Sequence, residues 1–322
     1  MGRLNLHIAL VAVFLIVASC ASWKRPQSYR ADASCDVHMR VALIGDLQRT
    51  GPVEVWRERN DVERALLLRQ LAADQPDALV LLGDMVWWGA SDEEWDYFDR
   101  VMEPVRSLRI PTLAVVGNHE YYGEDASAFD HLRARFDALS EVTWYTKVFD
   151  SVAYVVLNTN IEELTQRELW RQYIWFRTTM RTLDDDPSVR AVIVCGHHPP
   201  FTNSDVVSDE EVLQQHFVPS FLFSKKGAFW FSGHAHTYER FAVGNKQFIV
   251  SGGGGGPRQQ SIRAIHRDVY DGPPLRPFHY VIVERHGARI TASMTPLRRG
   301  PVLPDIATVD VDVDDRSLTS TE

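Results

Sequence analysis

Five short apolar runs are each followed, directly or after one residue, by glycine and then by aspartate, asparagine or histidine. Their length and composition are typical of strands buried on both faces, and they occupy residues 41–44, 78–82, 112–116, 191–194 and 228–231. Longer segments with the character of helices lie between them, at 53–73, 91–108, 166–183 and 208–223. This alternation predicts an α/β fold with a largely parallel core.

Further strands are predicted near the middle and the end of the chain. Residues 145–157 favour a hairpin that turns at Asp150 and Ser151, and later strands are expected at 247–251, 278–284 and 289–293. Five consecutive glycines at 252–256 either let the backbone approach a ligand or form a flexible crossing.

Length and composition are those of one main globular domain. The chain has 322 residues, of which 45% are hydrophobic and 24% charged. Its formal net charge of -9 gives no general electrostatic reason to bind nucleic acid, so we expect no such partner.

The pattern of the first residues indicates a secretory signal peptide. A short basic start precedes an apolar run at 8–17 that is too short to span a bilayer. Residues 17–20 resemble the lipobox of bacterial lipoproteins, with Cys20 as the lipidated residue; an ordinary signal peptide cleaved near Ala21, or a failed membrane helix, is the alternative. We therefore expect a protein of the bacterial cell envelope, attached to the membrane only through Cys20.

These observations predict four parts of the chain. They are a lipoprotein signal peptide at 1–19, the anchor cysteine and a polar linker at 20–37, the main domain at 38–297, and a flexible acidic tail at 298–322.

The polar residues that follow the five apolar runs are candidate ligands. In α/β sheets, ligands bind beyond the carboxyl ends of the strands, where glycine permits a tight turn. A single Gly-Asp pair is common as a turn or a helix cap. Five such turns in one chain, with Gly-Asn-His-Glu at 117–120 and His-x-His at 234–236, together predict a metal centre.

The same series resembles the calcineurin-like metallophosphoesterases over residues 40–295, and "GHAHTYER" and "VCGHHPP" are especially similar to the purple acid phosphatase branch. The resemblance implies a four-layer α/β/β/α sandwich of two mixed sheets with helices outside, and two divalent metal ions at the strand ends. By motif, Asp84 would bridge the metals, and His119 would contact the phosphate as a general acid or stabiliser. The implied metal ligands are Asp46, Gln48, Asp84, Asn118, His197, His234 and His236.

The chain departs from the family pattern at several positions. Gln48 stands where most members have histidine, Trp87 where purple acid phosphatases have a coordinating tyrosine, and Val206 and Val207 near positions where they have histidines. Gln48 can still offer a carbonyl oxygen, whereas Trp87 cannot coordinate a metal. The donor set favours Mn or Fe, with Zn as a further option.

The implied activity is hydrolysis of a small phosphate ester by a metal-activated hydroxide. Phosphomonoesters are the first expectation; phosphodiesters, nucleotide pyrophosphates and a non-catalytic phosphate-binding role in the envelope are the alternatives. Glu120 is expected to orient His119, and Arg49 either clamps a phosphate or is solvated. Four aromatic residues follow the candidate ligands, namely Trp87, Trp88, Tyr121 and Tyr122. They either form a wall for the substrate or pack loops onto the core.

Overall fold

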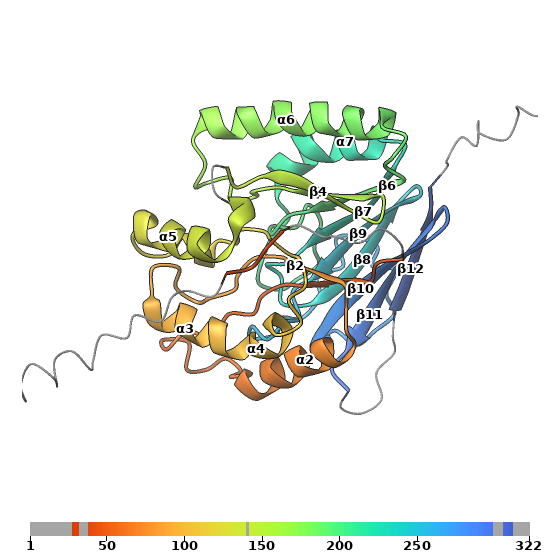
Figure 1. Cartoon of the computed structure of the whole chain (residues 1–322). Helices are drawn as coiled ribbons and strands as arrows, with labels where there is room; N and C mark the ends of the chain where they lie inside the picture. The colour runs from red at the N-terminus through yellow and green to blue at the C-terminus, as the bar shows by residue number, and fades with distance from the viewer. Residues whose placement is uncertain (1–27, 32–37, 140–141, 299–304, 312–322) are drawn as a thin grey trace, which may run out of the picture.

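Two six-stranded mixed sheets pack face to face and are covered by helices on their outer faces (Figure 1). The computed structural model describes residues 28–31, 38–139, 142–298 and 305–311. Within these residues no helix is long and apolar enough to cross a membrane. The four layers agree with the α/β/β/α sandwich that the family resemblance implies.

The first sheet contains, in chain order, β1 (Val41–Ile44), β2 (Ala78–Leu81), β3 (Thr112–Ala114), β10 (His279–His286), β11 (Arg289–Pro296) and β12 (Asp305–Asp310). Strands β1, β2 and β3 run parallel, because long crossovers connect them. Strands β10, β11 and β12 extend the sheet from β1 as antiparallel neighbours, so the spatial order is β12-β11-β10-β1-β2-β3.

The second sheet contains β4 (Tyr145–Phe149), β5 (Val152–Val156), β6 (Ala191–Cys195), β7 (Gly227–Ser232), β8 (Tyr238–Val243) and β9 (Lys246–Ser251). Strands β5, β6, β7 and β9 are parallel, and β4 and β8 close the two edges as antiparallel strands. The predicted hairpin is confirmed: Asp150 and Ser151 both have positive φ, at 46° and 62°, between β4 and β5.

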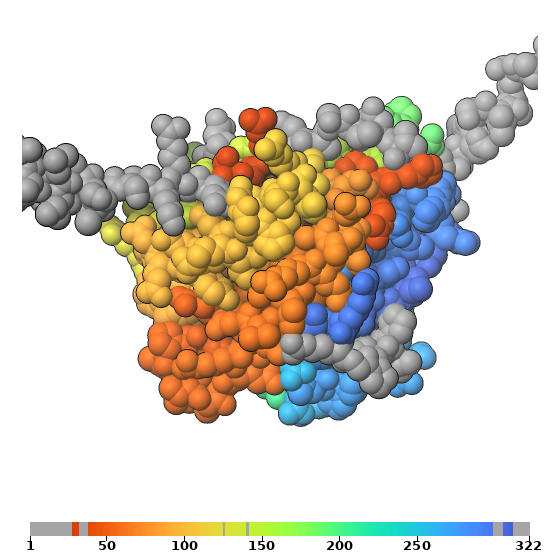
Figure 2. Space-filling view, turned by 60° about the horizontal axis from the view of Figure 1, so that its bottom comes forward, coloured from red at the N-terminus to blue at the C-terminus, as the bar shows by residue number. Residues whose placement is uncertain are grey.

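Helices α2 (Asp61–Ala73), α3 (Asp92–Val101) and α4 (Glu103–Arg106) cover the outer face of the first sheet, whereas α6 (Gln166–Asp185) and α7 (Val218–Phe223) cover the second (Figure 1). Figure 2 looks toward the first of these helical layers, where the orange surface lies beside the blue surface of the C-terminal strands. Helix α5 (Asp125–Arg135) lies beside the β3 edge, with one 3-10 turn before it (His119–Tyr121) and another after it (Asp137–Leu139). A π-helical turn (Leu213–Phe217) leads into α7. Three apolar clusters fill the spaces between these four layers.

The predicted helix over 53–73 begins later than expected, at Asp61. Residues 51–57 instead form turns that are closed by Glu54 N to Gly51 O (3.0 Å) and by Arg57 N to Glu54 O (3.0 Å). Val53, Val55 and Trp56 are 70%, 73% and 77% exposed, so this segment has no buried apolar face that would stabilise a helix.

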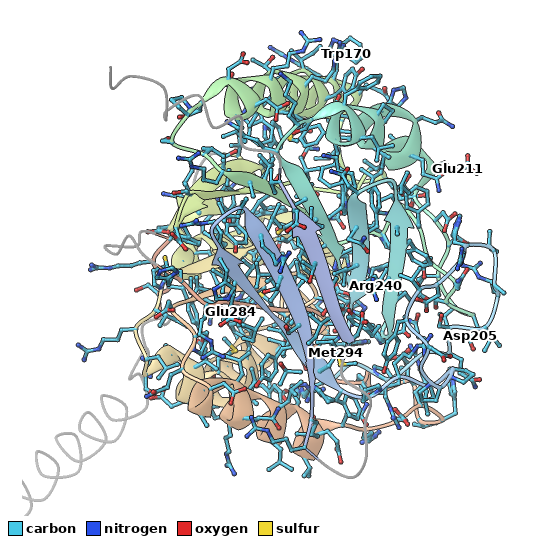
Figure 3. The ribbon with its side chains drawn as sticks, turned by 90° about the vertical axis from the view of Figure 1, so that its right-hand side faces the viewer. Trp170, Asp205, Glu211, Arg240, Glu284 and Met294 are labelled. Atoms are coloured by element: carbon cyan, nitrogen blue, oxygen red, sulfur yellow. The ribbon has the colours of Figure 1, made fainter. Side chains whose placement is uncertain are left out.

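The predicted tail at 298–322 is wrong for residues 305–310, which form β12. Ala307 and Val309 alternate with outward-facing residues and are buried, so small apolar side chains suffice to hold an edge strand. The carboxylate of Asp305 accepts hydrogen bonds from Tyr238 and Arg240 of β8, which tie β12 to the second sheet. Figure 3 shows Arg240 where the strands of the two sheets lie side by side. Residues 299–304 and 312–322 lie outside the described residues.

The predicted linker at 20–37 is also wrong in part, because residues 28–31 belong to the domain. Tyr29 is 5% exposed and stacks on Phe136, with 5.1 Å between the ring centroids. Backbone bonds join Tyr29 N to Arg135 O (2.6 Å) and Thr112 N to Arg30 O (2.7 Å). The predicted signal peptide at 1–19, Cys20 and the rest of the linker lie outside the described residues.

Candidate metal centre

The carboxyl ends of the parallel strands of both sheets meet at one edge of the molecule. Glycines make this close approach possible: a Cβ atom on Gly83 would lie 2.5 Å from His197 Nδ1, and one on Gly233 would lie 2.6 Å from Asp46 Oδ2. A side chain at either position would push the two sheets apart. The sequence predicted that glycine permits tight turns here, and the φ of 91° at Gly83 agrees with that role at this position. The close approach of the two sheets is a second role that was not predicted.

Three candidate ligands have left-handed backbone conformations, with φ of 62° at Asp46, 52° at Asp84 and 65° at His234. Such conformations cost non-glycine residues about 1 kcal/mol or more each, so surrounding contacts must hold them. The backbone N–H of His234 donates to Asp46 Oδ1 (3.0 Å), and that of Asp84 donates to Glu120 Oε2 (2.9 Å). The strained backbone at these three residues indicates that the surrounding contacts hold them in place.

A first donor set consists of Asp84, His197 and His234, whose ligand atoms lie within 4.8 Å of one another. His197 Nε2 is 3.2 Å from Asp84 Oδ2 and 3.1 Å from Asn118 Oδ1. The ring centroids of His197 and His234 are 5.0 Å apart. The structure therefore brings together four of the predicted ligands, including Asn118.

A second donor set consists of Asp46, Asp84 and His236, again with ligand atoms within 4.8 Å of one another. His236 Nε2 is 3.4 Å from Asp46 Oδ1. The side-chain amide of Gln48 joins this set, since its Nε2 is 3.3 Å from Asp84 Oδ2 and 3.0 Å from His236 Nε2. All seven predicted ligands thus converge, and Asp84 belongs to both sets.

The donors fit divalent cations. Asp46 and Asp84 are buried, and their ion-pair partners among the described residues are histidines. Gln48 Oε1 is buried without a hydrogen-bond partner. Rotation of this amide would direct Oε1 between Asp84 and His236, where a cation would satisfy it.

Three histidines direct one ring nitrogen at a backbone carbonyl, which fixes that nitrogen as the N–H donor and leaves Nε2 facing the site. The bonds join His197 Nδ1 to Leu82 O (2.8 Å), His236 Nδ1 to Pro257 O (2.8 Å) and His119 Nδ1 to Trp87 O (2.7 Å). Sequence reasoning missed these partners, because a backbone carbonyl has no side-chain signature.

The ionisable side chains of the site shift one another's pKa values. Burial opposes charge on His197, but the facing Asp84 carboxylate outweighs it and raises the pKa of His197 to about 9. Burial likewise opposes ionisation of Asp84, but His197 and His119 hold its pKa below the ordinary value. Burial and the neighbouring histidines lower the pKa of His234, which keeps that ring neutral and able to bind a metal.

His119 stands at the opening of this cluster. Its Nε2 is 3.9 Å from Asp84 Oδ2, and its ring packs on Tyr122 with 4.6 Å between centroids. The neighbouring His198, which was not expected to be a ligand, lies in neither donor set; its Nδ1 is 3.3 Å from Thr159 Oγ1. His119 is therefore placed to meet whatever binds at the metal donors.

Glu120 does not orient His119, contrary to expectation. Its buried carboxylate accepts backbone N–H groups of Asp84 (2.9 Å), Met85 (2.7 Å) and Gly117 (2.7 Å). Burial, together with the charge of Asp84, raises its pKa to about 7. Glu120 thus joins the turns after β2 and β3, and it reaches the site through the backbone of Asp84.

The five-glycine run packs against the donor turns. Gly254 N donates to Gly45 O and Gly256 N donates to Asp46 O, both at 2.9 Å. A Cβ atom on Gly252 would lie 2.1 Å from Ala235 O. The run is therefore a close-packed support of the site, which neither of the two expectations described.

The donors open into a hollow of about 390 Å³. Val206 and Val207 line this hollow, so the two valines that lie near the family's histidine positions are at the site itself. Arg49 also lines it, but its guanidinium pairs with Glu93 and Glu94, so it is neither a free phosphate clamp nor simply solvated. Sequence reasoning missed two lining residues on the 51–57 turns, Glu54 and Arg57.

The aromatic group divides between the two expected roles. Tyr121 packs on Phe129, with 5.0 Å between centroids, and so belongs to the core side. Trp88 and Tyr122 are 40% and 38% exposed, and their ring centroids lie 5.7 Å apart at the surface. Trp87 lines the hollow and covers Gly51, where a Cβ atom would lie 2.3 Å from the indole nitrogen.

Known proteins are similar to this chain in sequence and in fold. Purple acid phosphatase 21 of Arabidopsis thaliana is 27% identical over 243 residues, which cover 70% of this chain and 52% of that protein. Purple acid phosphatase 22 of the same plant is 26% identical over 213 residues, or 63% of this chain and 45% of that protein. The chain thus spans about half the length of these curated relatives.

The purple acid phosphatase PPD1 from yellow lupin (Lupinus luteus) seeds has a similar fold, with a TM-score of 0.66 and 18% identity over 88% of this chain and 55% of that chain. The family description "calcineurin-like phosphoesterase" matches residues 39–238, which is more than half of the chain. This match and the converging strand-end ligands lead to one conclusion: the chain belongs to the calcineurin-like phosphoesterase family, near its purple acid phosphatase branch.

Proposed function

We propose that this protein is a metal-dependent phosphoric ester hydrolase that acts on phosphomonoesters. The observation that carries the proposal is the pair of donor sets that share Asp84 and open, beside His119, into one hollow. Family membership and the purple acid phosphatase relatives support the same class of reaction.

We propose a binuclear centre with two divalent ions, chosen from Mn, Fe and Zn. Asp46, Gln48 and His236 would hold one ion and Asn118, His197 and His234 the other, with Asp84 common to both. When bound, two such ions supply positive charge for phosphate oxygens and lower the pKa of a water toward 7, which makes hydroxide available for attack on phosphorus.

The residues of the chain have separate tasks in this proposal. Among the proposed ligands only Asp46 and Asp84 are anionic, so the site keeps a net positive charge that attracts phosphate. His119 holds its Nδ1 proton against Trp87 O, and its Nε2 can carry a proton to the leaving oxygen or hydrogen-bond to the phosphate.

The test is metal analysis and turnover of protein purified without chelator. We expect close to two metal ions per chain and faster hydrolysis, with added Mn, of p-nitrophenyl phosphate than of its bis ester. Faster hydrolysis of the bis ester, or of a nucleotide pyrophosphate, would move the substrate class to diesters or pyrophosphates. Stoichiometric metal without turnover of any of these would favour a non-catalytic phosphate-binding role.

We also propose attachment to the bacterial envelope through a lipid on Cys20. The motif at 17–20 supports this attachment, and the acidic balance of the chain disfavours nucleic acid as a partner. Incorporation of labelled palmitate by the parent and its loss in Cys20→Ser would support the attachment; equal labelling of both would contradict it.

A further inference from the structure

The outer part of the hollow is more apolar than its base. Beyond the metal donors, Val53, Tyr122 and Val206 line the opening, and they are 70%, 38% and 58% exposed. The indole of Trp87 lines the same hollow. The most exposed lining residues are thus valines and a tyrosine, and a group that projects from the metal donors toward solvent can contact them.

The two arginines of the hollow are both neutralised by carboxylates. Arg57 Nη1 is 2.8 Å from Glu54 Oε1, and Arg49 pairs with Glu93 and Glu94. Glu54 Oε2 also accepts the backbone N–H of Gly51 at 3.0 Å, so its carboxylate is held at the opening. A second anionic group on a substrate would therefore find both arginines of the hollow already paired, and it would lose its hydration without gaining an ion pair.

From this distribution we propose that the site selects phosphomonoesters whose leaving group is uncharged and apolar or aromatic. The inference rests on the proposed phosphatase function and names its substrate class. The phosphate would lie at the metal donors, and the leaving group would lie along Val53, Tyr122 and Val206. Glu54, by pairing with Arg57, would leave that arginine unavailable to esters with a further negative charge. The residues at the opening would select for binding of the leaving group and take no part in the bond cleavage.

The first test compares 2-phenylethyl phosphate with ethyl phosphate in the metal-loaded protein. Both leaving alcohols have similar acidity, so a difference in kcat/KM reports contacts to the leaving group. We expect roughly tenfold higher kcat/KM for the phenylethyl ester, mainly through KM, as is usual for apolar contacts in a pocket. Equal values, or a preference for ethyl phosphate, would overturn the inference.

A matched pair of variants locates the preference. Val206→Ser should lower the ratio of the two kcat/KM values toward one, because a polar side chain replaces an exposed apolar contact. Val148→Ser is the control, since Val148 is 49% exposed on β4 and lies outside the residues that line the hollow. An unchanged ratio in Val206→Ser, or an equal fall in both variants, would contradict the assignment.

The charge at the opening is tested with 3-phosphooxypropanoate, which carries an additional carboxylate, against propyl phosphate. The parent should prefer propyl phosphate, and Glu54→Gln should raise the relative kcat/KM of the carboxylate ester severalfold. A parent that prefers the carboxylate ester would overturn the inference and direct attention to Arg59, which lines an adjoining hollow.

A binding measurement separates this inference from the proposed function. Calorimetric titration with 3-phenylpropylphosphonate and propylphosphonate, which cannot be hydrolysed, should give a lower Kd for the phenyl compound. If no ester is hydrolysed by the metal-loaded protein, the proposed function fails. If esters are hydrolysed and both phosphonates bind equally, only the leaving-group preference fails.

Discussion

The two donor sets share Asp84 but differ in chemistry and burial. The set around Asp46 and His236 is fully buried and includes the amide of Gln48, so oxygen dominates its donors. The other set has two imidazoles, and its His234 is only partly buried. Oxygen donors favour harder ions such as Mn, whereas imidazoles suit Zn and Fe as well.

The difference teaches that one site can contain two unequal donor sets with a single common carboxylate. Both sets reach the hollow where a substrate would enter, through Gln48 and His236 on one side and Asn118 and His234 on the other. The two sets thus differ in the type and burial of their donors. We therefore expect the two positions to differ in affinity, in selectivity and in their response to mutation.

The largest effect is expected from Asp84→Asn, which removes the ligand common to both sets. Metal content should fall at both positions, and kcat/KM for p-nitrophenyl phosphate should fall on the order of a thousandfold, as for loss of other charge-stabilising groups. Elemental analysis and steady-state kinetics measure both. Asp92→Asn is the control, because the Asp92 side chain is 98% exposed on α3; retained metal in Asp84→Asn would contradict the shared role.

A smaller and selective loss is expected from His234→Asn. The affinity of the imidazole-rich position should fall roughly a hundredfold or more, while the other position keeps its ion. Calorimetric titration with Mn and with Zn would resolve metal binding at the two positions. His198→Asn serves as the control, since the His198 ring lies 4.3 Å from that of His234 but belongs to neither set. Loss of both ions in His234→Asn would show that the sets are not separable.

Two substitutions of Gln48 are expected to change the rate of metal loss from the buried set in opposite directions. Gln48→His adds an imidazole and should slow the loss of metal to a chelator roughly tenfold, whereas Gln48→Ala should accelerate it. The rate of release to a coloured chelator measures both variants under identical conditions. If neither variant changes the release rate, Gln48 does not coordinate.

The last prediction concerns stability in acid and leaves metal binding unchanged. Burial lowers the pKa of His279 to about 4, and its Nε2 is 3.1 Å from Ser251 Oγ, away from the metal donors. Because the folded pKa lies below that of the unfolded chain, stability present above pH 6.5 declines as pH falls and is lost by about pH 4. The loss is at most about 3 kcal/mol.

Urea unfolding of the metal-free protein between pH 7.5 and pH 4.5 measures this term. His279→Asn should show a flatter decline than the parent, because the variant has no histidine at this position to protonate on unfolding. Parallel declines in both proteins would remove His279 as the cause.

Much of the fold and the ligand set could be predicted from the sequence, because their determinants are local. The apolar run before Gly45 fixes β1, and the turn after it places Asp46 at a carboxyl strand end. The hairpin at Asp150 and Ser151 was predicted for the same reason, since a short turn has few solutions.

Other features depend on contacts that no local pattern contains. The edge strand at 305–310 forms because β11 offers it an unpaired edge, and the turns at 51–57 replace a helix because that segment has nothing apolar to cover. Likewise, Glu120 is a neighbour of His119 in sequence, yet it bonds the backbone of Asp84.

The sequence by itself determined which side chains end the parallel strands and therefore which chemistry the protein can offer. Only the tertiary structure decided that the Nε2 atoms of Gln48 and His236, residues separated by 188 positions, lie 3.0 Å apart. It also decided that Glu54 and Arg57 line the hollow. The reason is that turns and strands follow from neighbouring residues, whereas the distance between two sheets is set by how all the buried side chains between them pack.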